Sequence, residues 1–135
     1  MNQSNAAPAS AESNSPLIFI VDDSPMLVEF AASVLQSAGC SVKSFTDPGL
    51  LLQALGGSAP KPALLVTDYD LGSNSINGLE LIINCHKIHP SMKTILASGT
   101  VDGSVTLHHP AKVDRFLSKP YPPAQLKAMV ADLLK

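Results

Sequence analysis

The chain has 135 residues, of which 45% are hydrophobic and 15% charged, and its formal net charge is −2. This length allows one domain of ordinary size with a buried core, and leaves no room for a second. The low charge and the lack of a Lys/Arg run argue against a nucleic-acid surface, because phosphate binding needs clustered positive charge. Without an 18-residue apolar run or a basic segment before one, neither a membrane span nor a signal peptide is expected, and a reducing cytoplasm is the default location.

The two cysteines, Cys40 and Cys85, lie far apart and show no CxxC spacing. Neither a zinc site nor a disulfide framework is therefore indicated. We expect both to be small buried apolar residues.

Short apolar runs alternate with segments of helical periodicity after a polar stretch at residues 1–15, which we expect to be a disordered tail. The remaining residues, 16–135, are expected to form the domain. The expected strands are 17–21, 42–45, 63–67, 94–97 and 116–118. The expected helices are 25–38, 48–55, 79–88 and 122–134. This alternation predicts an α/β fold in which a doubly wound parallel sheet of five strands lies between two layers of helices.

The segment from Thr100 to Val113 has a weaker helical pattern than the others. Asp102 can cap a helix there, but the residues that follow it, Gly103 to Thr106, are poor helix formers. Pro110 then prevents continuation. We therefore expect a short or labile helix of about two turns at most.

Polar residues follow four of the five expected strands at their carboxyl ends. They are Asp22 and Asp23 after the first, Asp68 after the third, Ser98 after the fourth and Lys119 after the fifth. Ligands of open parallel sheets bind at this edge, so these side chains are expected to converge. Each alone has an ordinary explanation as a helix cap, a turn residue or a solvated lysine.

Three carboxylates in one site repel one another, which either raises their pKa values or recruits a cation. Mg²⁺ prefers oxygen ligands and retains several waters, so it suits this set better than zinc does. With the ion bound, Asp68 could attack phosphorus while the Lys119 ammonium neutralises developing charge. Ser98 could donate a hydrogen bond to the attached phosphoryl group.

These motifs, in this order, resemble the response-regulator receiver domain of two-component signalling, in the form of a single-domain receiver like that of chemotaxis. The resemblance covers about residues 16–135. It implies a flavodoxin-like three-layer sandwich with strand order 2-1-3-4-5. It also implies a phosphoacceptor switch that catalyses only its own phosphorylation and dephosphorylation, and so is no enzyme in the ordinary sense.

The resemblance assigns a role to each site residue. Asp68 would be the phosphoacceptor, and the metal, Mg²⁺ or in its place Mn²⁺, would be held by Asp22, Asp23, Asp68 and the backbone carbonyl of Asp70. Ser98, Lys119 and Phe116 would bind the phosphoryl group or switch in response to it. The peptide bond between Lys119 and Pro120 would be cis.

The expected partners are a sensor histidine kinase or a histidine phosphotransfer protein, and a downstream protein that the sequence does not identify. Nucleic acid and membrane are not expected partners, and the chain should be a monomer or a weak dimer. It could also be a receiver excised from a larger hybrid protein.

The sequence departs from the family pattern in one loop. The loop from Asp70 to Gly78 is longer than usual for the family and lacks the customary Met-Pro.

Two other functions are compatible with parts of the sequence. One is a receiver fold that serves as a docking module without phosphorylation. The other is a small phosphatase of the haloacid-dehalogenase kind, because Asp68-Tyr69-Asp70 resembles its DxD motif. That family has DxD after its first strand, however, and carries a cap domain for which this chain has no room. A flavodoxin-type cofactor site is disfavoured, because Asp22 and Asp23 would repel a phosphate.

Overall fold

The computed structural model describes residues 15–135, so all of the predicted tail except Ser15 lies outside the described residues. The element order is β1 (Leu17–Val21), α2 (Pro25–Ser37), β2 (Ser41–Phe45), α3 (Pro48–Gly56), β3 (Leu64–Asp68), α4 (Gly78–Ile88), β4 (Lys93–Ser98), η1 (Gly103–Thr106), β5 (Arg115–Ser118) and α5 (Pro123–Leu133). Helices α2 and α3 begin at the expected residues and α4 begins one residue earlier, because the side chains of Ser24, Asp47 and Asn77 accept hydrogen bonds from backbone N–H groups of the first turns. Helix α5 has no such cap and begins at Pro123, one residue later than expected.

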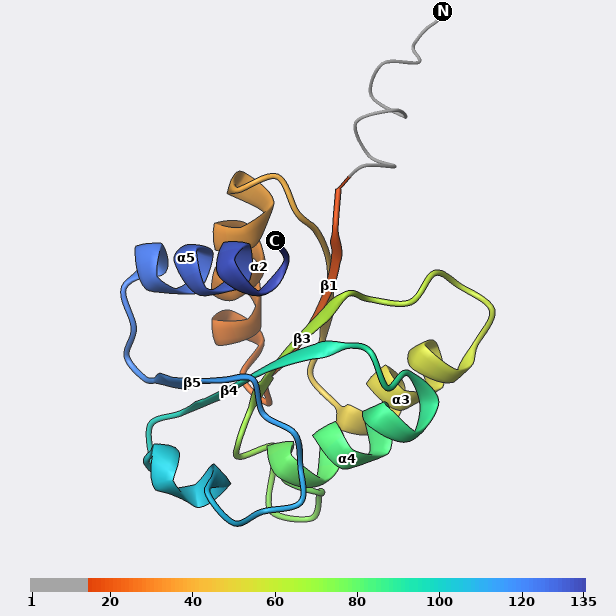
Figure 1. Cartoon of the computed structure of the whole chain (residues 1–135), viewed down its shortest axis with the longest axis vertical. Helices are drawn as coiled ribbons and strands as arrows, with labels where there is room; N and C mark the ends of the chain where they lie inside the picture. Colours follow the sequence, from red (N-terminus) through yellow and green to blue (C-terminus); the bar gives the residue numbers. More distant parts are fainter. Residues whose placement is uncertain (1–14) are drawn as a thin grey trace, which may run out of the picture.

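All five strands are parallel and lie in the order β2-β1-β3-β4-β5, so the predicted fold class is confirmed. Helices α2 and α5 cover one face of the sheet, and α3 and α4 cover the other (Figure 1). The strand β3 lies at the centre and is buried along its whole length. Its last residue, Asp68, is therefore held by a strand that is paired on both sides and buried on both faces.

Each face of the sheet has its own hydrophobic core. Ile18, Ile20, Leu64 and Val66 pack against α2 and α5, whereas the alternate residues Phe19 and Leu65 pack against α3 and α4. This follows from the two-residue period of strands.

The two cysteines differ in burial. Cys85 is fully buried, as predicted, and this burial raises its pKa to about 12. Cys40 is only partly buried, so the prediction for Cys40 was wrong.

The segment after β4 forms only η1, a four-residue 3₁₀-helix, in agreement with the expected short helix. The side chain of Asp102 caps it by accepting a hydrogen bond from the Ser104 N–H (2.9 Å). No residue of η1 is buried. This part of the β4 to β5 connection is therefore only partly covered, whereas Ala111 further along it is buried. Within residues 15–135, no helix is both long and apolar enough to cross a membrane.

Candidate functional site

The polar residues singled out from the sequence lie at the carboxyl edge of the sheet. Asp22 follows β1 directly and Lys119 follows β5, while Asp68 and Ser98 are the last residues of β3 and β4 rather than the first residues after them. Asp22 is turned into the site because its Oδ1 accepts a hydrogen bond from the Ser24 N–H (3.0 Å). The first turn of α2 thus fixes the direction of this carboxylate.

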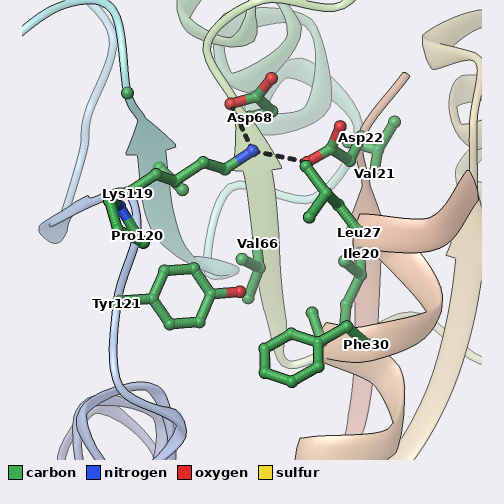
Figure 2. A pocket seen from close by; sticks show the side chains of 13 residues that line it. Ile20, Val21, Asp22, Leu27, Phe30, Val66, Asp68, Lys119, Pro120 and Tyr121 are labelled. Carbon is green, nitrogen blue, oxygen red and sulfur yellow. Dashed lines mark hydrogen bonds and ion pairs between the residues drawn. The ribbon is translucent and has the colours of Figure 1, made fainter. Parts of the chain in front are cut away.

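Lys119 lies between two of the carboxylates. Its Nζ is 2.7 Å from Asp22 Oδ2 and 3.1 Å from Asp68 Oδ1 (Figure 2). The three side chains are only 21%, 9% and 10% exposed, so these charges interact more strongly than they would in water. The peptide bond from Lys119 to Pro120 is cis.

Asp22, Asp23 and Asp68 form an acidic cluster in which one carboxylate oxygen of each lies within 4.8 Å of the others. Burial, followed by hydrogen bonding and charge repulsion from Asp22, raises the pKa of Asp23. Burial also raises the pKa of Asp68, although Lys119 acts in the opposite direction. For Asp68, loss of hydration together with repulsion from Asp22 and Asp70 therefore outweighs the attraction of the ammonium.

The Lys119 ammonium completes the charge balance of the site. Burial alone lowers the pKa of Lys119, but its hydrogen bonds with Asp22 and Asp68 and their negative charges overcome this and raise it. Three carboxylates and one ammonium leave a net charge of −2, which one divalent cation would neutralise. Because all the available ligand atoms are oxygens, the cluster fits Mg²⁺.

Asp23 differs from the other two acids. It is exposed at the edge of the cluster and forms no salt bridge with any residue of the range 15–135. The oxygens of Asp22, by contrast, already accept hydrogen bonds from Ser24 and Lys119. Asp23 is therefore the acid best placed to exchange water for a metal ion.

Asp70 and Ser98 do not join the Lys119 network. The Asp70 carboxylate is not one of the three that converge, and instead accepts a hydrogen bond from the Thr100 hydroxyl (2.6 Å). Ser98 is buried, and its Oγ accepts hydrogen bonds from the N–H groups of Thr100 (3.0 Å) and Val101 (3.1 Å). The Ser98 hydroxyl is thus engaged by its own loop.

Phe116 lies further from the acids, on β5 beside η1. Its ring is half-buried and packs against Gly103, where an added Cβ would lie 3.5 Å from the ring. The site therefore has two parts within the described chain. The acids and Lys119 contact one another, whereas Ser98 and Phe116 contact the segment that leads into and through η1.

Three features of the site had not been identified from the sequence. The first is that position 78 requires glycine, because a Cβ there would lie 2.4 Å from the Asp68 carbonyl oxygen. In the sequence, the Asn77-Gly78 pair indicates only the start of a helix. The hydrogen bond between Thr100 and Asp70 joins loops that are thirty residues apart. No periodic pattern in the sequence indicates such a contact.

The third feature is a cavity of about 530 Å³ that lies below Lys119 on the α2 side of the sheet (Figure 2). Its walls are mostly apolar and include Leu27 and Phe30 from α2 and Tyr121 from the connection between β5 and α5. Leu27 and Phe30 fall on the helical repeat of apolar residues in α2, but both are 45% exposed. An apolar hollow with exposed rim residues therefore adjoins the acidic cluster.

Comparison with known proteins gives the family. The family model of the response regulator receiver domain matches residues 18–131, and the chain belongs to this family. The chain is 28% identical over 106 residues to the nitrogen assimilation regulatory protein NtrX of Azorhizobium caulinodans. That match covers 77% of this chain but 23% of NtrX, so the chain spans less than a quarter of this curated relative's length.

Solved structures show the same fold. A CheY-like response regulator receiver domain protein from Methanospirillum hungatei JF-1 has a TM-score of 0.80 at 24% identity, over 90% of this chain and 94% of that one. A response regulator receiver protein from Sinorhizobium medicae WSM419 has a TM-score of 0.79 at 24% identity, over 90% and 96%. Receiver domains accept a phosphoryl group on an aspartate, generally bind Mg²⁺ at an acidic cluster, and interact with histidine kinases or phosphotransfer proteins.

Proposed function

We propose that this receiver domain, residues 16–135, accepts a phosphoryl group on Asp68 from a histidine kinase or a histidine phosphotransfer protein. The observation that carries the proposal is that Asp68 ends the buried central strand, contacts Lys119 and belongs to the acidic cluster. Asp22 shares the last two properties, but its two carboxylate oxygens already accept hydrogen bonds from the Ser24 N–H and from Lys119. A carboxylate oxygen of Asp68 would form the new O–P bond as the P–N bond to the donor imidazole breaks.

The metal would be held by Asp22, Asp23 and Asp68 together with the backbone carbonyl of Asp70, with water completing its coordination. When bound, Mg²⁺ or Mn²⁺ supplies positive charge that stabilises the phosphoryl oxygens. Lys119 would keep its ammonium beside Asp68 and contact one phosphoryl oxygen. Ser98 would donate a hydrogen bond to another, and Phe116 would respond by repacking.

The donor protein would dock on α2 beside the acidic cluster. Large apolar side chains are exposed here, with Met26 at 79% and Leu27 and Phe30 at 45% each. Leu27 and Phe30 also line the cavity that reaches Asp68. Exposed apolar surface next to a reactive group favours a protein partner, because burying it contributes to association. The output would likewise act through protein contacts in the cytoplasm.

The acceptor is tested with a small phosphodonor and Mg²⁺, followed by mass spectrometry. Wild-type protein should gain one phosphoryl group in an acid-labile, hydroxylamine-sensitive linkage, and Asp68→Asn should gain none. Asp70→Asn should still be labelled, because Asp70 is the other acid of the DxD motif but lies outside the acidic cluster. Equal labelling of wild type and Asp68→Asn would place the acceptor elsewhere. A wild-type protein that gains no mass would instead indicate the docking module.

The docking face is tested by comparing two exposed apolar residues on opposite sides of the sheet. Phe30→Ser should slow transfer from a phosphorylated donor protein at least about tenfold more than transfer from a small phosphodonor. Leu50→Ser is the matched control, because Leu50 is 54% exposed but lies on α3. If the two variants slow protein-mediated transfer equally, α2 is not the docking face.

A further inference from the structure

The buried Ser98 hydroxyl at the end of β4 lies within hydrogen-bonding distance of three groups. Its oxygen accepts hydrogen bonds from the N–H groups of Thr100 and Val101, at 3.0 and 3.1 Å. It also lies 3.2 Å from the Thr100 hydroxyl oxygen. A hydroxyl has two lone pairs and one proton. The backbone N–H groups occupy the lone pairs, so the contact with the Thr100 hydroxyl is left for the Ser98 proton.

The direction of this last hydrogen bond follows from Asp70. The Thr100 hydroxyl lies 2.6 Å from Asp70 Oδ2 and donates its one proton there, because a carboxylate only accepts. Thr100 therefore has no second proton for Ser98. The Ser98 O–H must donate to the Thr100 oxygen, and the protons of both hydroxyls are directed toward Asp70.

We propose that Thr100 and Asp70 are positioning residues that act through Ser98, forming a hydrogen-bond relay that holds the Ser98 proton away from Asp68. The inference rests on the proposed function, in which Ser98 donates to a phosphoryl group on Asp68. Ser98 has one proton, so the phosphoryl group must displace Thr100 as its acceptor. The relay thus stabilises the unphosphorylated arrangement and opposes the switched one.

The relay also connects the acceptor site with the output segment. Thr100 and Val101 lead directly to Asp102, which caps η1, and Gly103 of η1 packs against Phe116. When Ser98 turns toward the phosphoryl group, the hydrogen bonds from Thr100 and Val101 must lengthen or break. The start of η1 and its contact with Phe116 are then less restrained.

The variant that isolates the relay is Thr100→Val, which keeps the side-chain shape and the net charge but removes the hydroxyl. Asp70→Asn is less suitable, because the Asp70 charge also acts on the pKa of Asp68. The probe is beryllofluoride with Mg²⁺, a stable mimic of the phosphoryl group, titrated by NMR. Thr100→Val should bind it about three- to tenfold more tightly than wild type, the range expected for one competing hydrogen bond. Thr100→Ser keeps the hydroxyl and should bind like wild type.

A double-mutant cycle with Ser98→Ala tests whether the effect passes through Ser98. The relay predicts that Thr100→Val has no effect on beryllofluoride binding in the Ser98→Ala background. An effect of the same size in both backgrounds would overturn the relay, because it would arise from Asp70 or the metal site. Equal affinity of Thr100→Val and wild type would overturn it as well.

A second readout does not depend on phosphoryl chemistry. In wild-type protein without ligand, NMR couplings of Ser98 should report one χ1 rotamer. Thr100→Val removes one of the three hydrogen bonds that hold this rotamer, so a second rotamer should become measurably populated although the two backbone N–H groups still bind the Ser98 oxygen. An unchanged rotamer in Thr100→Val would overturn the relay even if the acceptor assignment holds. A wild-type protein that neither binds beryllofluoride nor is phosphorylated would instead overturn the proposed function, and with it the competition for the Ser98 proton.

Discussion

Replacing Asp23 by Asn should stabilise the protein without divalent cations and make it less stable than wild type when Mg²⁺ is abundant. Two unit charges 4.8 Å apart repel by about 0.9 kcal/mol at the dielectric constant of water. Water has the highest dielectric constant that applies here, so this energy is the smallest repulsion expected at that distance. Because Asp23 is exposed to water, we use this value for its repulsion by Asp22 and for its repulsion by Asp68. Salt roughly halves each contribution, and Lys119 offsets part of the sum. The net gain of Asp23→Asn should be about 0.5 kcal/mol, or about 2 °C in Tm.

The pH dependence has a definite sign. The pKa of Asp23 is raised on folding, first by a partial loss of hydration, although the side chain remains mostly exposed, and then by Asp22. The folded state therefore binds its proton more tightly than the unfolded state, and stability falls as pH rises from the ordinary value of 3.8 through the raised value. Asp23→Asn removes this loss, so its advantage should be full at neutral pH and absent near pH 3.

Mg²⁺ should reverse the order of stability. At a hundred times the wild-type Kd, binding stabilises wild type by about 2.7 kcal/mol, whereas a variant that binds tenfold more weakly gains about 1.4 kcal/mol. The assay is urea unfolding with EDTA and with Mg²⁺, and Glu29→Gln is the control because Glu29 is an exposed acid on α2 outside the cluster. An Asp23→Asn variant that is less stable than wild type in EDTA at neutral pH would refute the repulsion.

Further predictions concern the lysine, the packing and the output segment. Lys119→Met should raise the pKa of Asp68 further, since the ammonium is what lowers it, and should abolish the structural response to beryllofluoride; both are measured by NMR. Gly78→Ala should destabilise the fold by about 1–3 kcal/mol in urea unfolding, because its Cβ would lie 2.4 Å from the Asp68 carbonyl oxygen. Leu35→Ala should cost about 2–5 kcal/mol in the same assay, because Leu35 is fully buried in the core beside α5. Amides 103–109 should exchange hydrogen faster than those of α5, and equal protection would refute the lability of this segment.

The fold could be predicted closely because its elements have strong local patterns. The β1 run from Leu17 to Val21 is continuously apolar, and the alternation of strands with capped helices leaves few possible topologies. The carboxyl ends of β3 and β4 lie one residue later than the sequence predicts. Asp68 and Ser98 lie inside β3 and β4 because their backbones remain paired with neighbouring strands, which side-chain polarity does not indicate.

The site could be predicted only in part, because some of its contacts join loops that are far apart in the sequence and have no regular structure. The convergence of Asp22, Asp68 and Lys119 follows from the parallel sheet, since strand ends meet at one edge. The partner of the Ser98 hydroxyl does not follow, because it depends on how two irregular loops meet. The exposure of Leu27 and Phe30 does not follow from the sequence either, because their helical spacing is that of apolar residues which are buried elsewhere in α2, and only the cavity beside them leaves them exposed.

The two edges of the sheet bear on how copies of this domain can associate. β2, at one edge, exposes Lys43 and Ser44, and β5, at the other, has only four residues and exposes Arg115. Charged side chains and short strands at an edge disfavour pairing with another sheet, which is a common route to aggregation. The domain can therefore accumulate to high local concentration without extending its sheet from chain to chain. Specific assembly is therefore favoured through helix or loop surfaces, the same surfaces that phosphorylation can alter.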